Sequence, residues 1–145
     1  MWPPEVERIV APLRAAGLEA RIEELPAGEL AAPGLAVRAF AYICDGREVV
    51  VLVEAETEPD PAKVAKAAEC RDARRVSAPP FPYGRARVLL EQRLLTAGTV
   101  WLGAGSPRHV LGLDPAVLAQ VTRASAADLS AEPPRTGEVD SRGRG

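Results

Sequence analysis

The feature that most constrains the fold is a pair of apolar segments joined by a two-residue turn. Residues 35–44 and 47–54 are rich in apolar side chains, and Asp45-Gly46 between them is a strong signal for a β-hairpin. The second segment contains five consecutive apolar residues, 49–53, which is typical of a strand that is covered on both faces. We therefore expect a sheet with packed layers built around this hairpin.

Helical patterns flank the hairpin on both sides. Apolar residues spaced three and four positions apart predict a helix over 4–16, in which Pro12 should introduce a kink or an early end. Asp60 is placed to cap a second helix over 61–69. A third helix is expected from Asp114 to about residue 121.

Shorter extended segments complete the pattern. We expect strands at residues 18–25, 73–76, 99–102 and 109–113. Turn-rich or proline-rich connections are expected at 26–34 and 77–84, and the pattern over 88–95 supports no assignment. The order of helices and strands predicts an α+β domain with a mixed, largely antiparallel β-sheet flanked by helices.

Length and charge limit the classes of protein to which the chain can belong. Its 145 residues suit one domain, which we place at residues 1–130, and the polar residues 131–145 are expected to form a disordered tail. The 18 basic and 20 acidic side chains give a net charge of −2, which disfavours a surface that is basic all over but allows a local basic patch. No apolar run approaches the ~18 residues of a membrane span, and the start does not resemble a signal peptide, so we expect a cytoplasmic protein.

The sequence offers little for metal or redox chemistry. Cys44 and Cys70 are 26 positions apart, which matches no zinc or redox motif, so we expect two reduced and partly buried thiols. His109 is the only histidine and cannot by itself supply a histidine-based metal site. We therefore expect neither a metal nor a cofactor.

Three features could contact a ligand, and each has a simpler explanation. Arg38 interrupts an apolar strand on the same side as Phe40 and Tyr42, which fits either a ligand-binding cation or a salt bridge at an edge strand. Residues 103–106 fit either a tight turn between two strands or a loop that contacts ligand, and the turn is favoured. A cluster of basic residues fits either solvated charge or contact with a nucleic-acid backbone; its members are Arg71, Arg74, Arg75, Arg85, Arg87 and Arg93.

Taken in order, these segments resemble the YbaK and prolyl-tRNA-synthetase-associated editing-domain family, whose members hydrolyse mischarged aminoacyl-tRNA. The segment VRAFAYICDG at 37–46 is similar to the family's strand V-K-S-L-V-F-x-x-D-G, and TVWLGAGSP at 99–107 is similar to its late strand V-W-x-x-A-G-S-P. Further similarity lies in the opening helix and strand, in PAKVA at 61–65 and in residues 113–129, so that the resemblance covers about residues 4–130.

The resemblance implies a site and a partner, together with two departures from the family pattern. Arg38 stands where the family has a lysine, and residues 77–84 are a shortened form of the family's glycine-rich G-x-x-x-P loop. Arginine keeps the positive charge but, because its guanidinium group is always protonated in proteins, does not shuttle protons. By resemblance, Arg38 is the candidate catalytic residue, Ala104, Gly105 and Ser106 would line the substrate pocket, and Arg71, Arg74, Arg75, Arg85 and Arg87 would meet tRNA.

Three hypotheses about function remain side by side. The first is a deacylase that acts in trans on the acceptor end of mischarged tRNA, and the second is a catalytically inactive relative that binds tRNA or a small ligand. The third is an interaction module that shares only the architecture. A homodimer is compatible with each of them.

Overall fold

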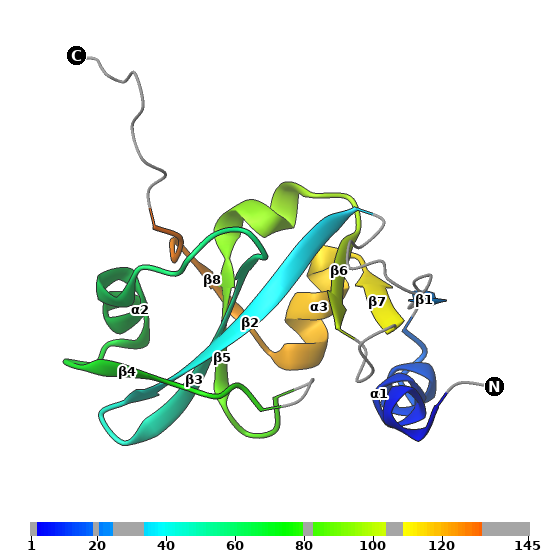
Figure 1. Ribbon diagram of the computed structural model, residues 1–145, viewed down its shortest axis with the longest axis horizontal. Coiled ribbons are helices and arrows are strands. Elements are labelled where there is room, and N and C mark those ends of the chain that lie inside the picture. Colours follow the sequence, from blue (N-terminus) through cyan, green and yellow to red (C-terminus); the bar gives the residue numbers. More distant parts are fainter. Residues whose placement is uncertain (1–2, 19–20, 25–33, 80–82, 104–108, 132–145) are drawn as a thin grey trace, which may run out of the picture.

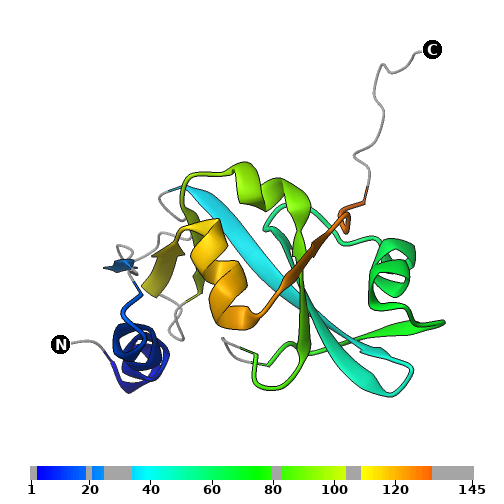
Figure 2. The same cartoon turned by 180° about the vertical axis from the view of Figure 1, so that it is seen from behind.

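The computed structural model describes residues 3–18, 21–24, 34–79, 83–103 and 109–131. These residues form one α+β domain in which three α-helices pack on a mixed sheet of eight strands (Figures 1 and 2), and the predicted fold class is confirmed. The elements are α1 (Pro4–Ala15), β1 (Arg21–Glu24), β2 (Leu35–Cys44), β3 (Arg47–Glu54), α2 (Pro61–Ala68), β4 (Ala73–Val76), β5 (Arg87–Glu91), the 3-10 helix η1 (Gln92–Thr96), β6 (Val100–Gly103), β7 (His109–Leu113), α3 (Pro115–Thr122) and β8 (Ser125–Ala127).

The predicted hairpin is the centre of the sheet. β2 and β3 pair antiparallel from Cys44 opposite Arg47 to Val37 opposite Glu54. Asp45 and Gly46 both have positive φ, 50° and 84°, which is the backbone twist that a two-residue hairpin turn requires. Aspartate and glycine tolerate this conformation, so the dipeptide sets the register of the longest pair of strands.

Strand β2 runs across the whole sheet and carries a neighbour on each edge (Figure 1). β3 pairs along one edge, while the other edge is shared: β6 pairs in parallel with Leu35 and Ala36, and β4 pairs antiparallel with residues 41–44. The main order of strands is β1-β7-β6-β2-β3-β5-β8. Every part of the sheet is therefore positioned, directly or through one or two neighbours, by the hairpin.

Two apolar cores lie on opposite faces of this sheet. Val50 and Leu52 of β3 pack into the core that includes α1 and α3, whereas Val51 of β3 packs into the core that includes Val64 of α2. α3 lies behind the sheet in Figure 1 and in front of it in Figure 2. The predicted covering of residues 49–53 on both faces is confirmed, because all five side chains are 3% exposed or less.

A buried carboxylate connects the C-terminal strand to the sheet. β8 pairs in parallel with β5, and Glu91 at the end of β5 is only 2% exposed. Its Oε1 accepts hydrogen bonds from the backbone N–H of Leu129 (2.8 Å) and from the N–H and hydroxyl of Ser130 (2.9 and 3.0 Å), while Oε2 accepts from the N–H of Arg93 (3.1 Å). Burial alone would raise the pKa of this carboxyl, but the hydrogen bonds outweigh it and lower the pKa below the usual glutamate value.

The remaining elements differ from expectation at their boundaries. The helix expected over 4–16 is α1, which continues through Pro12 to Ala15, and Pro12 lies on its exposed side. The unassigned segment 88–95 forms most of β5 and η1, and β8 was not expected from the sequence. Residues 25–33 and 132–145, which include most of one expected connection and nearly all of the expected tail, lie outside the described residues.

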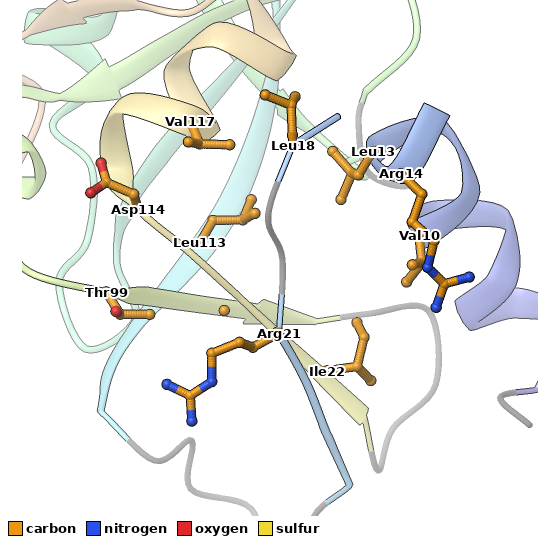
Figure 3. A pocket seen from close by; sticks show the side chains of 11 residues that line it. Val10, Leu13, Arg14, Leu18, Arg21, Ile22, Thr99, Leu113, Asp114 and Val117 are labelled. Atoms are coloured by element: carbon orange, nitrogen blue, oxygen red, sulfur yellow. The ribbon is translucent and has the colours of Figure 1, made fainter. Parts of the chain in front are cut away.

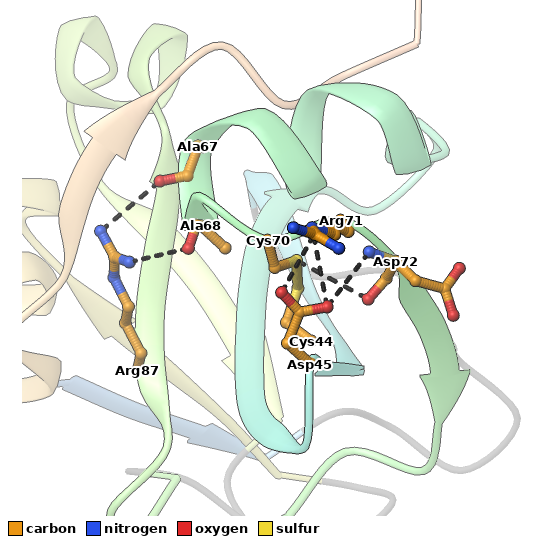
Figure 4. Close-up of a disulfide and its surroundings, with 8 residues drawn as sticks. All are labelled: Cys44, Asp45, Ala67, Ala68, Cys70, Arg71, Asp72 and Arg87. Atoms are coloured by element: carbon orange, nitrogen blue, oxygen red, sulfur yellow. Dashed lines mark hydrogen bonds between the residues drawn. A yellow bond between two sulfur atoms is a disulfide. The ribbon is translucent and has the colours of Figure 1, made fainter.

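The expectation of two reduced thiols was wrong, because Cys44 and Cys70 form a disulfide (Figure 4). Cys44 ends β2 and Cys70 follows α2, and their Cα atoms are 5.7 Å apart, within the range that a disulfide spans. Next to the bridge, the Asp45 carboxylate accepts hydrogen bonds from the backbone N–H groups of Arg71 and Asp72. The separation of 26 residues gave no sign of this contact, since it arises only when α2 folds back along the hairpin.

Candidate functional site

Arg38 is an exposed cation near the middle of β2. The centre of its guanidinium lies 4.7 Å from the centroid of the Phe40 ring, on the face that strand alternation predicts. Within the described part of the chain it forms no ion pair, so the salt bridge considered as an alternative is not observed there. Among the described residues, an aromatic ring and not a carboxylate holds this guanidinium in place.

A second arginine approaches the same ring from the neighbouring strand. Arg75 of β4 pairs with Tyr42 of β2, and its guanidinium lies 4.5 Å from the Phe40 centroid and 5.4 Å from the Tyr42 centroid. It also forms an exposed ion pair of 3.3 Å with Glu58, in the connection between β3 and α2. Arg38 and Arg75 thus share one buried phenylalanine ring, which is 4% exposed.

A similar contact occurs at the other end of the sheet. The guanidinium of Arg21 in β1 lies 5.4 Å from the ring of Trp101 in β6, although β7 separates the two strands. The intervening residue is Gly112, which pairs with both Arg21 and Trp101. A Cβ atom at Gly112 would lie 2.7 Å from the indole ring, so glycine is what allows the ring to cross β7 and meet Arg21.

These contacts all lie on one face of the sheet. Residues paired in a ladder share a face, and residues two apart on a strand share it too. Gly112 pairs with both Arg21 and Trp101, so these three positions share a face. Trp101 pairs in turn with Ala36, which shares that face with Arg38 and the other even-numbered positions of β2. We call this set the arginine–aromatic face; its members are Arg21, Arg38, Arg75, Phe40, Tyr42 and Trp101. Sequence analysis missed Arg21 and Trp101, whose association depends on a strand pairing that their own segments do not reveal.

The predicted basic cluster does not gather on that face. Arg74 pairs with Ile43, so alternation directs it to the opposite face from Arg75. Arg87 donates to the backbone carbonyls of Ala68 and Ala67 at the end of α2, at 3.3 and 3.5 Å (Figure 4). The others are exposed elsewhere: Arg71 after the disulfide, Arg85 before β5 and Arg93 in η1.

A cavity of about 670 Å³ lies between α1, β1, β7 and α3 (Figure 3). Leu13, Leu113 and Val117 point into it from three different elements, and Arg21 lies at its edge. Arg38 is not among the described residues that line it. Its volume and its largely apolar lining suit a small organic group.

The remaining predicted site residues have no described position. Gly103 ends β6, but Ala104, Gly105 and Ser106 lie outside the described residues, as do residues 80–82 of the shortened loop. Where the chain is described, no cluster of three or more potential metal ligands occurs. In the same residues, no helix is both long and apolar enough to cross a bilayer.

Comparison with known proteins identifies the fold. No protein-family model matches this chain, and no curated protein matches its sequence. Among solved structures, a candidate trans-editing enzyme for prolyl-tRNA synthetase is 21% identical, with a TM-score of 0.77 over 91% of this chain and all of the other. A scaffold protein used in computational epitope grafting (23% identity, TM-score 0.78, 91% and 100% coverage) and the hypothetical protein APE2540 (17%, 0.75, 86% and 100%) are also similar. At these identities the likeness shows the fold alone.

Proposed function

We propose that this chain is an aminoacyl-tRNA deacylase that acts in trans, with Arg38 as the cation that meets the acceptor end of the tRNA. The exposed Arg38 guanidinium, held over the Phe40 ring at 4.7 Å, is the observation that carries the proposal. The fold that 91% of this chain shares with a candidate trans-editing enzyme supports it. The resemblance around residues 37–46 supports the same position for the functional cation.

The proposed reaction is hydrolysis of the ester that joins an amino acid to the terminal ribose. A water oxygen attacks the ester carbonyl carbon, the bond from that carbon to the ribose oxygen breaks, and one proton from the water ends on the ribose oxygen. Arg38 acts as a fixed positive charge throughout, because a guanidinium group does not give up its proton in proteins. Its role is therefore to bind phosphate or to stabilise negative charge on the carbonyl oxygen, and Ala104, Gly105 and Ser106 are the proposed substrate-lining segment.

One observation favours a second candidate, a relative that binds tRNA without hydrolysing it. In the described part of the chain, Arg38 lies over an aromatic ring and no carboxylate that could accept a proton from water forms an ion pair with it. A deacylase can instead draw on the substrate or on backbone groups to position the water. Both candidates bind tRNA, but only the deacylase releases the amino acid from it.

A deacylation assay with an Arg38 series separates them. Each of a panel of mischarged tRNAs, labelled in the amino acid, is incubated with wild-type protein in excess, and free amino acid is measured over time. We expect release above the uncatalysed rate on at least one substrate, a drop of about 10²-fold in Arg38→Ala by analogy with the loss of one oxyanion donor, and partial recovery in Arg38→Lys. Arg93→Ala, exposed and outside the arginine–aromatic face, is the matched control.

The outcomes discriminate between the candidates. Release at the uncatalysed rate on every substrate rejects the deacylase, and tRNA binding that persists in that case supports the non-catalytic relative. Equal loss of activity in Arg93→Ala and Arg38→Ala would remove the specific role of Arg38.

A further inference from the structure

We infer that the arginine–aromatic face binds unpaired RNA, with bases stacking on the guanidinium groups of Arg21, Arg38 and Arg75. The inference rests on the proposed function in taking the single-stranded 3′ end of tRNA as the natural ligand. Binding itself does not require an ester or its hydrolysis. The ligand chemistry is a short single strand with accessible bases and a phosphate backbone.

The first argument is how the cations are held. Each of the three guanidinium groups lies 4.5–5.4 Å from an aromatic centroid, so one side of it faces a ring. The side chains remain accessible: Arg21 is 69% exposed and Arg75 is 48% exposed. A guanidinium group that an aromatic ring already holds in place loses little freedom on binding, and bases commonly stack on the plane of such a group.

The second argument is that the aromatic rings are themselves buried. Phe40 and Trp101 are each 4% exposed and Tyr42 is 1% exposed. A ligand on this face therefore meets the arginines and not the rings beneath them. This arrangement favours stacking and phosphate contacts together, which is the combination that binds single strands without strong sequence preference.

The third argument is the extent of the face. From Arg21 to β2 the sheet takes three steps, through β7 and β6, of about 4.8 Å each. Along β2, from Ala36 to Tyr42, six residues of about 3.3 Å each add roughly 20 Å at right angles to this. The cations are therefore spread over a length that suits several nucleotides, not a single phosphate.

The carboxylates near the face are compatible with this ligand. Glu23 pairs with Arg21 at 3.5 Å and Glu58 pairs with Arg75 at 3.3 Å. All four side chains are more than two-fifths exposed, and exposed ion pairs of this kind contribute little to stability. Phosphate groups can therefore replace the carboxylates as partners, and Arg38 forms no such pair within the described residues.

The test measures binding of a fluorescent single-stranded RNA of twelve nucleotides by anisotropy, with the same sequence as a blunt duplex for comparison. Arg75→Ala and Arg21→Ala should each weaken single-strand binding about tenfold, since loss of one stacking contact commonly costs that much or more. Arg74→Ala is the matched control, because it removes an exposed arginine from the next position of the same strand but from the opposite face.

Two further variants distinguish stacking from charge. Arg75→Lys keeps the positive charge but removes the planar group, so it should bind nearly as weakly as Arg75→Ala. Phe40→Leu keeps an apolar side chain in the core but removes the ring beneath Arg38 and Arg75, so it should also weaken binding. Circular dichroism and thermal unfolding confirm that each variant used is folded.

Several results would overturn the inference: Arg74→Ala weakening binding as much as Arg75→Ala, duplex binding as tight as single-strand binding, or an acidic peptide competing as well as RNA. Full affinity in Arg75→Lys would reduce the interaction to charge alone and would equally reject stacking. Because the RNA carries no aminoacyl ester, the result is independent of the deacylation assay. Hydrolysis without face-dependent binding rejects only this inference, and face-dependent binding without hydrolysis rejects only the deacylase.

Discussion

Replacing Glu91 with glutamine tests how strongly the C-terminal strand depends on one buried carboxylate. In the wild type, Oε1 accepts three hydrogen bonds from Leu129 and Ser130, and Oε2 accepts one from Arg93. Glutamine keeps one carbonyl oxygen for the first three, but its amide group faces the Arg93 N–H, donor against donor. A hydrogen bond to a charged group stabilises by about 2 kcal/mol and a neutral one by about 1 kcal/mol, so the three retained bonds lose about 3 kcal/mol together. Loss of the bond to Arg93 removes about 2 kcal/mol more.

Urea unfolding at neutral pH, followed by circular dichroism, measures this difference. We expect Glu91→Gln to lower the free energy of unfolding by about 5 kcal/mol, a large part of the 5–15 kcal/mol typical of a domain. Glu48→Gln is the matched control, because Glu48 is an exposed carboxylate in the hairpin and should change stability little. A Glu91→Gln protein as stable as the Glu48→Gln control would refute the reasoning.

The same carboxylate predicts a dependence on pH. Its pKa is lower in the folded protein than in the unfolded chain, where glutamate has a pKa of about 4.3. Its stabilising effect is therefore complete above about pH 4.3 and disappears as the pH falls through the lower folded pKa. The gap in unfolding free energy between wild type and Glu91→Gln should shrink on acidification, and a gap that stays constant from pH 7 to pH 3 would contradict this.

Two other features give predictions of similar precision. Gly112→Ala places a Cβ atom 2.7 Å from the Trp101 ring, so we expect the free energy of unfolding, measured with heat or urea, to fall by about 1–3 kcal/mol. Gly98→Ala is the control, because no atom lies within 4 Å of the added Cβ and stability should change little. Equal effects of the two substitutions would contradict the close approach of Gly112 to Trp101. Reducing the Cys44–Cys70 disulfide, which closes a loop over 26 positions, should lower the free energy of unfolding by about 3 kcal/mol and therefore lower the melting temperature. A melting temperature that reductant does not change would show that the bridge contributes no stability.

Local patterns predicted the hairpin because two independent signals agreed. Asp45-Gly46 specified the turn, and the apolar run over 49–53 specified burial on both faces, and both are observed. The orientation of Arg38 also followed from alternation alone, since a strand leaves only two choices of face. Such properties depend on neighbours in the chain and can be derived without knowing the fold.

Properties that depend on distant pairings could not be derived in this way. The strand Ser125–Ala127 has no alternating apolar pattern, and its position depends on β5 and on Glu91. Arg74 and Arg75 looked equivalent in the sequence, yet pairing with β2 directs them to opposite faces. The disulfide likewise depends on where α2 ends relative to the hairpin.

Because β2 pairs with three other strands, insertions and deletions within β2 should be tolerated much less well than those in the chain connections. One residue added within β2 would reverse the facing of every later position in that strand, so that side chains buried in one core would be exchanged with those of the other. The ladders with β3, β4 and β6 could not all adjust to the same shift. Natural variants of this fold should therefore differ in length at the chain connections, while strand β2 keeps a constant length from one protein to the next.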